Sequence, residues 1–248
     1  GNFWSVGGSW RLDQESFIAS QPWISALKLR ASYGSVGNDG TDSWYQWQSL
    51  YGILNNANAS GFIQSTQAGN KELQWEKNRS FDVAVEFGFF DNRLNGQIEF
   101  FHRISDNLLF EVPLPTSSGV LSQWQNIGSM YNQGIELQLG GDIIRTKDVT
   151  WNILVNASHI KNEITKLPQE EIISGTKKYM VGHSMYDFWL RKWEGVDPET
   201  GDALYLKDIK DAEGNVTGSE IVNDYTIADY YYVGTSIPDL YGSIQNTL

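Results

Sequence analysis

The 248-residue sequence predicts an all-β fold made of long antiparallel strands. Three observations predict it: apolar residues alternate with polar ones, short polar turns separate some alternating segments, and long connections separate the others. Alternation at a period of two is typical of a strand whose two faces meet different surroundings. Tight turns between alternating segments indicate that neighbouring strands run in opposite directions.

The clearest hairpin is predicted at 81–101. In 81–89 every odd position is large and apolar, and the even positions carry Asp, Ala, Glu and Gly. The polar pair Asp91 and Asn92 follows, and the alternation resumes over 94–101. Because Asp and Asn favour tight turns, the two segments are expected to pair as neighbouring antiparallel strands.

A second hairpin is predicted further along the chain. Alternating segments over 135–143 and 151–158 are joined by a short polar turn at 145–148. The same alternation predicts a strand over 25–34. Partial strands are expected at 2–10 and 239–248.

The connections between these strands have very unequal lengths. Two turns are tight, whereas the connections at 35–72, 111–129 and 164–236 are long and rich in Gly, Asn, Ser and aromatic residues. Long connections of this kind are usually functional. Tight turns at one end, long loops at the other and strands of roughly ten residues are typical of outer-membrane barrels. We therefore predict an antiparallel transmembrane β-barrel segment with long extracellular loops.

The composition fits this prediction. The chain has 10 Trp, 12 Tyr and 11 Phe but a mean hydropathy of −0.38, and no apolar run approaches the roughly 20 residues that a membrane helix needs. In a barrel strand the large apolar residues occupy one face only, which keeps the average polar. Aromatic residues also fall near predicted strand ends, where barrels carry aromatic girdles: Trp10, Tyr33, Trp75, Phe89, Phe90, Phe110, Tyr131 and Trp151.

Alternation alone also fits a soluble β-sandwich. A soluble all-β carbohydrate-binding module is therefore the alternative function, and an accessory domain of a glycoside hydrolase is a third. The barrel is favoured because the faces opposite the apolar stripes carry Gln, Asn, Glu, Asp and Gly rather than the Lys- and Thr-rich surface typical of a sheet in water.

Other function classes find no support in the sequence. The net charge is −12 and no cluster of Lys or Arg offers a track for phosphates, so nucleic acid is not an expected partner. The absence of Cys excludes thiolate metal sites and cysteine nucleophiles. Because no nucleophile-elbow, P-loop or H-E-x-x-H motif occurs, we predict no catalytic residues, no cofactor and no enzymatic activity.

One block of the sequence carries a specific resemblance. Residues 27–38 read LKLRASYGSVGN, which is similar to a block of the SusC/RagA class of TonB-dependent outer-membrane transporters. Further blocks resemble that family in the same order along the chain: 73–78, 89–95, 126–136, 151–152 with Asn156, 161–164, 195–201 and 237–242. The resemblance covers essentially all 248 residues.

The resemblance implies a location in the outer membrane, in contact with membrane lipid. Residues 1–248 would form the C-terminal part of a 22-stranded barrel, without its plug, its TonB box and its final strands. It further implies a SusD-like surface lipoprotein as a partner, and energy coupling to TonB–ExbB–ExbD through the missing N-terminal region. The implied role is import of glycans, or less often peptides, across a Bacteroidota-type outer membrane.

Two sets of candidate residues follow. Aromatic and amide side chains in the long loops are expected to bind substrate, because aromatic faces pack on sugars while amides bind hydroxyls; the alternative is that they pack the loops together. This set comprises Trp44, Tyr45, Trp47, Tyr51, Trp124 and Gln125. Charged residues on the polar faces of the strands are expected to face the barrel lumen, with Arg30 or Lys28 paired to carboxylates or to the plug. This set comprises Lys28, Arg30, Glu86, Glu99, Glu136 and Asp142.

Metal binding has weak support. Asp197 and Asp202 offer oxygen ligands of the kind that calcium prefers, but their spacing is not that of the 12-residue calcium loop. A Pro-Glu-Thr-Gly turn between two short strands explains the same residues, and this interpretation is favoured. We therefore predict no metal site.

Overall fold

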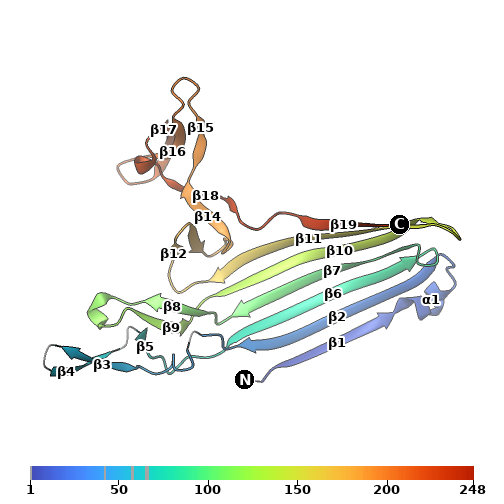
Figure 1. Cartoon of the computed structure of the whole chain (residues 1–248), viewed down its shortest axis with the longest axis horizontal. Coiled ribbons are helices and arrows are strands. Elements are labelled where there is room, and N and C mark those ends of the chain that lie inside the picture. Colours follow the sequence, from blue (N-terminus) through green and yellow to red (C-terminus); the bar gives the residue numbers. More distant parts are fainter. Residues whose placement is uncertain (1, 42, 57–58, 65–66) are drawn as a thin grey trace. The chain divides into compact units, whose positions relative to one another are not determined.

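Seven long strands in one sheet dominate the structure (Figure 1). The computed structural model describes residues 2–41, 43–56, 59–64 and 67–248. The chain divides into two compact units, the first comprising Gly1–Pro168 with Asp239–Leu248 and the second Gln169–Pro238. Within the described part of the chain, none of the helices has the length and apolarity to cross a membrane.

The large sheet belongs to the first unit, and every strand in it pairs antiparallel with its neighbours. Their spatial order is also their order along the chain, as expected for an up-and-down barrel wall. The strands, in that order, are β1 (Trp4–Arg11), β2 (Ile24–Asn38), β6 (Glu76–Phe89), β7 (Leu94–Asp106), β10 (Ser129–Arg145), β11 (Thr150–Lys166) and β19 (Tyr241–Thr247).

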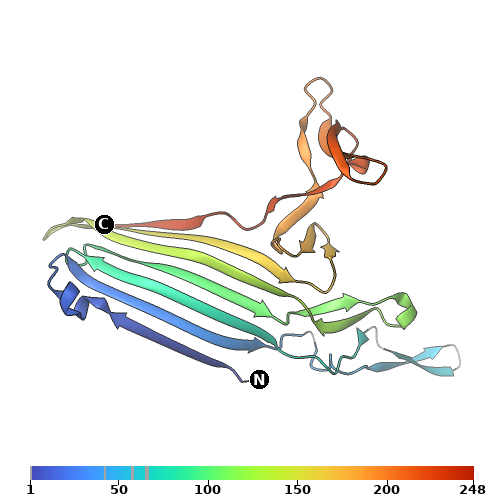
Figure 2. The same cartoon turned by 180° about the vertical axis from the view of Figure 1, so that it is seen from behind.

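The connections of this sheet differ systematically between its two ends. At one end lie the tight turns 90–93 and 146–149 and a short helical connection formed by η1 (Leu12–Gln14) and α1 (Ser16–Ala19). At the opposite end lie the long connections 39–75, 107–128 and 167–240. This arrangement confirms the predicted segregation of short turns and long loops, and Figures 1 and 2 show it for the tight turns and for the connections of the first unit.

The strands extend further than the alternation predicts, mainly toward the long loops. β10 begins at Ser129 where the prediction begins at 135, and β11 ends at Lys166 where the prediction ends at 158. The additional residues include Gln133 and Lys161 at positions that continue the apolar stripes. The alternation therefore fades there, although the backbone pairing continues.

The sheet has one apolar face and one polar face. Strand register places Leu29 opposite Val85, Val85 opposite Ile98, and Ile98 opposite Leu137. On this apolar face Ile98 is 49% exposed and Ile135 is 53% exposed. A soluble sheet would bury such residues against a second layer, whereas Figures 1 and 2 show the small loop sheets of this unit beyond the ends of the long strands.

The strands approach closely at glycines on this face. A Cβ atom at Gly96 would lie 2.2 Å from the carbonyl oxygen of Gln138 and 3.0 Å from the ring of Phe87. The ring of Phe87 therefore covers Gly96, and a larger residue there would push β7 away from β10. A glycine in the middle of a strand is explained here by this close packing.

The turn between β6 and β7 has an unusual backbone. Phe90, Asp91 and Asn92 have φ angles of 55°, 56° and 58°, in the left-handed region that bulky residues rarely adopt. Phe90 is held there because its N–H donates to the carbonyl of Trp23 at 2.9 Å. The Trp23 ring also contacts Phe89, with centroids 5.4 Å apart. These contacts form part of an aromatic cluster at the tight-turn end of the sheet.

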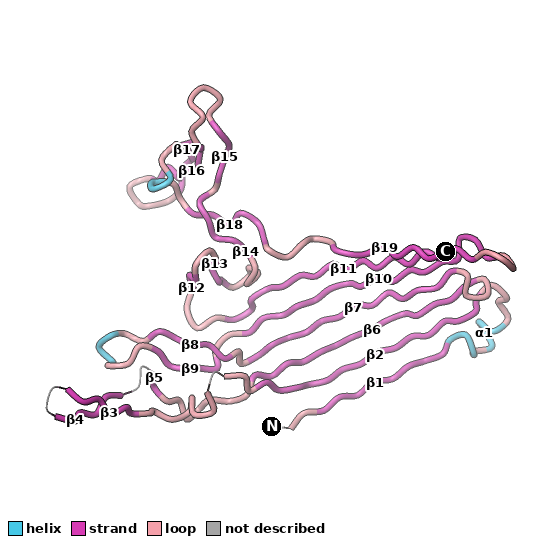
Figure 3. The backbone as a smooth tube through the Cα atoms, in the orientation of Figure 1, coloured by secondary structure: helices cyan, strands magenta, loops and turns pink. Residues whose placement is uncertain are grey.

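The long connections of the first unit are themselves structured, which the sequence did not predict. β3 and β4 form a hairpin, and β5, β9 and β8 form a small sheet with η2 in the connection from β8 to β9 (Figure 3). Their bounds are β3 (Tyr51–Asn56), β4 (Ala59–Gln64), β5 (Gln67–Ala68), β8 (Leu109–Pro113), η2 (Thr116–Ser118) and β9 (Ser122–Asn126).

The second unit contains two further small sheets within the segment 164–236, which the sequence predicts as a long connection; the predicted turn between two short strands at 198–201 is confirmed by the pairing of β15 with β16. One sheet has the order β12-β13-β14-β18 and the other β15-β16-β17. Their bounds are β12 (Glu171–Ser174), β13 (Lys177–Met180), β14 (Asp187–Arg191), β15 (Trp193–Val196), β16 (Ala203–Lys210), β17 (Val216–Val222), η3 (Tyr225–Ile227) and β18 (Tyr230–Thr235).

Candidate functional site

The polar face of the large sheet carries an ion-pair network over β2, β6 and β7. Lys28 Nζ lies 3.2 Å from Glu86 Oε2, and Arg30 Nε lies 3.0 Å from Glu86 Oε1. Arg30 also pairs with Glu99. Register sets Arg30 opposite the small Ala84 and Ala84 opposite Glu99, so the guanidinium reaches across β6 to the next strand. The expected pairing of these cations with carboxylates is thus observed for both.

Glu136 and Asp142 lie on the same face but in a different setting. Glu136 is opposite Glu99 in the register of β7 and β10, on the side away from the Arg30 pair. Asp142 accepts a hydrogen bond from Asn152 Nδ2 at 2.9 Å and lies 3.8 Å from Arg145. All six charged residues of the predicted lumen set therefore lie on one face of one sheet.

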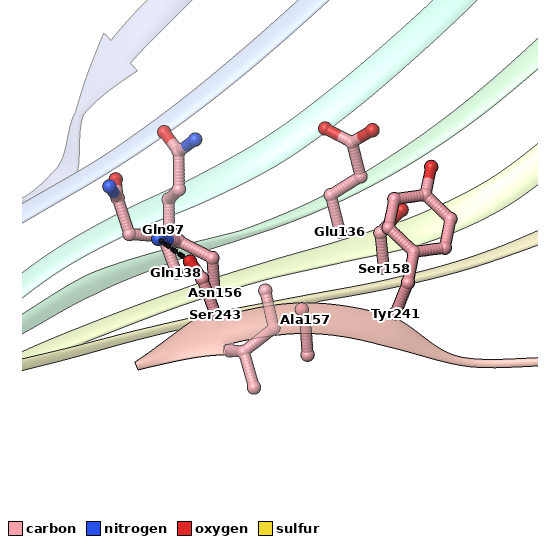
Figure 4. A pocket seen from close by; sticks show the side chains of 10 residues that line it. Gln97, Glu136, Gln138, Asn156, Ala157, Ser158, Tyr241 and Ser243 are labelled. Atoms are coloured by element: carbon pink, nitrogen blue, oxygen red, sulfur yellow. Dashed lines mark hydrogen bonds between the residues drawn. The ribbon is translucent and has the colours of Figure 1, made fainter. Parts of the chain in front are cut away.

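A shallow cavity of about 480 Å³ lies beside Glu136, over β7, β10, β11 and β19. Figure 4 shows Gln97, Gln138 and Tyr241 pointing to the same side of the sheet as Glu136, whereas Ala157 points to the other side. Asn156 donates to the hydroxyl of Ser243 at 3.3 Å, as the dashed line marks. This part of the polar face offers amides and hydroxyls rather than ion pairs.

A second cavity, of about 340 Å³, lies among the loops that follow β2. Trp44, Trp47 and Trp75 line it, together with Gln46 and Lys71. Gln46 is 4% exposed, and its Oε1 has no hydrogen-bond partner in the described structure. A buried acceptor without a donor costs free energy, and Gln46 is among the residues that line this cavity.

The structure brings together some of the predicted binding residues and separates others. Trp44 and Trp47 line the loop cavity, but Tyr45 and Tyr51 do not, and both are exposed. Trp124 and Gln125 lie on β9. The carbonyl of Trp124 accepts from Asn70 at 2.8 Å, and Gln125 donates to Gln123 at 2.9 Å.

Two residues that line the loop cavity, Trp75 and Lys71, are not among the binding residues that the sequence predicts. Trp75 is predicted as a girdle aromatic, and its ring in fact stacks on Phe3 at 5.6 Å and lines the cavity from the end of the connection. Lys71 is a lone lysine in a polar segment. No local pattern links either residue to Trp44 and Trp47, since the loops meet only in the folded chain.

The two weak calcium candidates, Asp197 and Asp202, occupy a turn of the second unit. Asp197 Oδ1 accepts from the backbone N–H of Glu199 at 2.8 Å and from that of Thr200 at 3.4 Å. Asp202 accepts from Asn223 at 3.3 Å. These carboxylates therefore stabilise a turn and a neighbouring strand end. Among the described residues, no group of three or more His, Cys, Asp or Glu side chains is placed to hold a metal ion.

Comparison with known proteins agrees with this architecture. Residues 1–246 match the family described as "TonB dependent receptor-like, beta-barrel". A TonB-dependent receptor of Formosa agariphila is 31% identical over 98% of this chain. The TonB-dependent receptor SusC of Bacteroides thetaiotaomicron is 34% identical over 67% of the chain. The solved structure of the RagAB peptide transporter covers 98% of the chain with a TM-score of 0.82 and 31% identity.

The chain spans about a quarter or less of these relatives, corresponding to 26% of the Formosa receptor, 17% of SusC and 27% of the RagAB chain. The match over the long strands assigns the chain to an outer-membrane protein, which replaces the soluble carbohydrate-binding alternative. Its exposed apolar face then meets lipid rather than a second sheet. The chain belongs to the family of TonB-dependent receptor β-barrels and is similar to SusC and RagA.

Proposed function

We propose that this chain forms wall strands and outer loops of a TonB-dependent transporter that imports oligosaccharides across the outer membrane. Family membership supports TonB-dependent import as the general activity. The loop cavity carries the proposal for the substrate, because indole rings pack on the CH faces of sugars while a buried amide oxygen accepts from a hydroxyl. Trp44, Trp47 and Trp75 would supply the rings, and Gln46 the acceptor.

Peptide import is the second candidate. The RagAB structure, described as that of a peptide transporter, is 31% identical to this chain. Peptide N–H groups would satisfy Gln46 as well as hydroxyls do. An oligosaccharide is favoured because three tryptophans line one cavity of about 340 Å³.

The remaining roles follow from the same proposal. The charged side chains of the polar face would point into the barrel lumen, where ion pairs are shielded from lipid. A SusD-like lipoprotein would cover the loops, and the rest of the protein would contact TonB–ExbB–ExbD. The TonB-dependent receptors among the relatives support a role in transport rather than catalysis.

The test uses the complete transporter, purified in detergent and screened against an array of soluble glycan fragments and a peptide library. We expect binding to glycans, weakened about tenfold by Trp47→Ala, which corresponds to about 1.4 kcal/mol. Gln46→Ala should weaken binding by a similar factor, because it removes the acceptor. Trp193→Ala, an exposed Trp outside the cavity, is the matched control and should leave affinity unchanged. Binding to peptides alone, or equal effects of Trp47→Ala and Trp193→Ala, would contradict the proposal.

A further inference from the structure

On the apolar face of the large sheet, apolar residues give way to more polar ones toward the long loops. The change occurs at similar heights on five neighbouring strands. The last fully apolar row of the central strands is Ala31, Val83, Phe100 and Ile135, one residue from each of β2, β6, β7 and β10. The next row on the same face, two residues nearer the long loops, is Tyr33, Phe81, His102, Gln133 and Lys161. β11 becomes polar one row earlier, at His159.

Beyond that boundary, polar and charged residues occupy most of the positions that continue the apolar stripes, with Phe81 on β6 and Ile104 on β7 as apolar exceptions. We call this group the outward belt, and it consists of Lys77, Arg79, His102, Asp106, Tyr131, Gln133, Lys161 and Glu163. Strand register places all of them on the face that is apolar further down the strands. These side chains therefore point to the lipid side of the wall, not to the lumen.

The outward belt is ordered by contacts between neighbouring strands. Arg79 pairs with Asp106 across β6 and β7. The hydroxyl of Tyr131 donates to Glu163 at 2.7 Å, and Lys161 Nζ lies 2.8 Å from the same carboxylate. His102 lies 3.2 Å from the amide oxygen of Gln133. Carboxylates thus hold two cations in place while leaving them accessible, Arg79 at 38% and Lys161 at 56% exposure.

The apolar rows have the height of a bilayer interior. From Phe89 to Phe81 the chain advances eight residues, or about 26 Å at roughly 3.3 Å per residue. At the strand tilt of roughly 40° typical of barrels, this corresponds to about 20 Å, and the side chains at both ends extend it toward the usual band of about 25 Å. The opposite limit is the aromatic cluster of Trp23, Phe89 and Phe90 at the tight turns.

We propose that the outward belt lies at the headgroup level of the outer leaflet, where Arg79 and Lys161 bind the phosphate groups of membrane lipids. The long loops mark this end of the sheet as extracellular. The chain carries a net charge of −12, yet three cations lie in this belt against two carboxylates. Basic side chains just outside the apolar band attract anionic headgroups. β10 continues four residues beyond Gln133 and β11 continues five residues beyond Lys161. These strand ends would extend past the bilayer and support the loops.

The position of the boundary is tested by nitroxide labels on the complete transporter in phosphatidylcholine vesicles. The 248 residues contain no Cys, so each label site in this segment is created by one substitution. We expect Val83→Cys and Ile135→Cys labels to be relaxed mainly by oxygen, and Lys77→Cys and Tyr131→Cys labels mainly by a water-soluble nickel chelate. The assignment would be overturned if the change from relaxation by oxygen to relaxation by the nickel chelate occurred more than one row away from this boundary, in either direction.

Binding of the cations to anionic lipid phosphate is tested by comparing vesicles of phosphatidylcholine, whose phosphate charge is balanced by choline, with vesicles that also contain the net anionic phosphatidylglycerol. Lys161→Gln should weaken the association with the anionic lipid about fivefold, because one basic residue near the surface is worth about 1 kcal/mol. Lys161→Arg should restore it. The matched control is Lys207→Gln, which removes another exposed lysine paired to a glutamate, at 2.7 Å. The proposal fails if Lys161→Gln leaves the association with the anionic lipid unchanged, or if Lys207→Gln weakens that association by the same factor.

Discussion

The two compact units of the chain are ordered by different kinds of contact. In the first unit, strands of up to 17 residues pair along their length, and side chains far apart in sequence meet, such as Arg30 and Glu99, 69 positions apart. In the second unit the strands have four to eight residues. Rings and cations there contact one another, for example Lys178 Nζ at 4.3 Å from the ring of Trp189.

The difference reflects what surrounds each unit. The first unit has one face suited to lipid and another suited to water, so a strict alternation satisfies both surroundings at once. In the second unit, Ala228 is the one hydrophobic residue among those described that is less than a tenth exposed. Without a buried layer, its order depends on turns and on stacked pairs such as His183 and Tyr232, whose ring centroids lie 3.8 Å apart. Pairing along long strands and pairing in short strands and turns should therefore respond differently to substitution.

The largest effect is expected from a charge on the apolar face of the first unit. Val85 lies near the middle of the apolar band, and Val85→Lys should destabilise the protein by about 2–4 kcal/mol, because the ammonium would be placed in lipid. Urea-induced unfolding of the complete protein in lipid vesicles measures this difference. The control is Gln138→Lys on the polar face, expected to cost less than about 1 kcal/mol. Equal losses for the two variants would contradict the assignment of the faces.

The same contrast explains what the sequence can predict. The hairpins at 81–101 and 135–158 are predicted correctly because lipid and lumen impose opposite polarity on alternate residues. The ends of β10 and β11 are missed because Gln133 and Lys161 lie on the lipid side beyond the apolar band, where polar residues return. The turn between two short strands at 198–201 is predicted correctly, since β15 and β16 pair on either side of it. The other small strands of 167–240 are missed because neither of their faces has to be apolar throughout.

The candidate sites follow the same division. The six charged residues of the polar face could be predicted, since parity within a strand and register between strands are enough to bring them onto one face. The loop cavity could be predicted only in part. Trp44 and Trp47 are close in sequence, whereas Trp75 and Lys71 join them through the folding of a long connection, which leaves no periodic trace.

An intermediate effect is expected from the ion-pair network. Arg30→Gln removes a side chain that is 34% exposed and contacts Glu86 and Glu99, so a loss of about 1 kcal/mol is expected. A double-mutant cycle with Glu99→Gln should give a coupling of roughly 0.5–1 kcal/mol in urea unfolding. The cycle with Asp142→Asn, a carboxylate of the same face that pairs elsewhere, should be additive within about 0.5 kcal/mol. Additivity in both cycles would mean that the network contributes nothing measurable.

The smallest effect tests the local contacts of the second unit. The backbone N–H of Asn215 donates to Asp211 Oδ1 at 2.8 Å, its side-chain amide also donates, and these bonds hold the pKa of Asp211 below its ordinary value of 3.8. Because the pKa is lower in the folded chain, the stabilisation is present above pH 3.8 and is lost as the pH falls through the lowered value. A carboxyl titration by NMR should therefore give a midpoint below 3.8.

The contribution of each donor to Asp211 can be separated by substitution. Asn215→Ala removes the side-chain amide but keeps the backbone N–H, which is the larger cause, so the midpoint should rise only part of the way toward 3.8. Asp211→Asn identifies the signal by removing it. A midpoint at or above 3.8 in the unsubstituted protein would mean that this turn is not held by its carboxylate. In that case the contrast between a unit ordered by long paired strands and one ordered by short strands and turns would lose its clearest example of a turn.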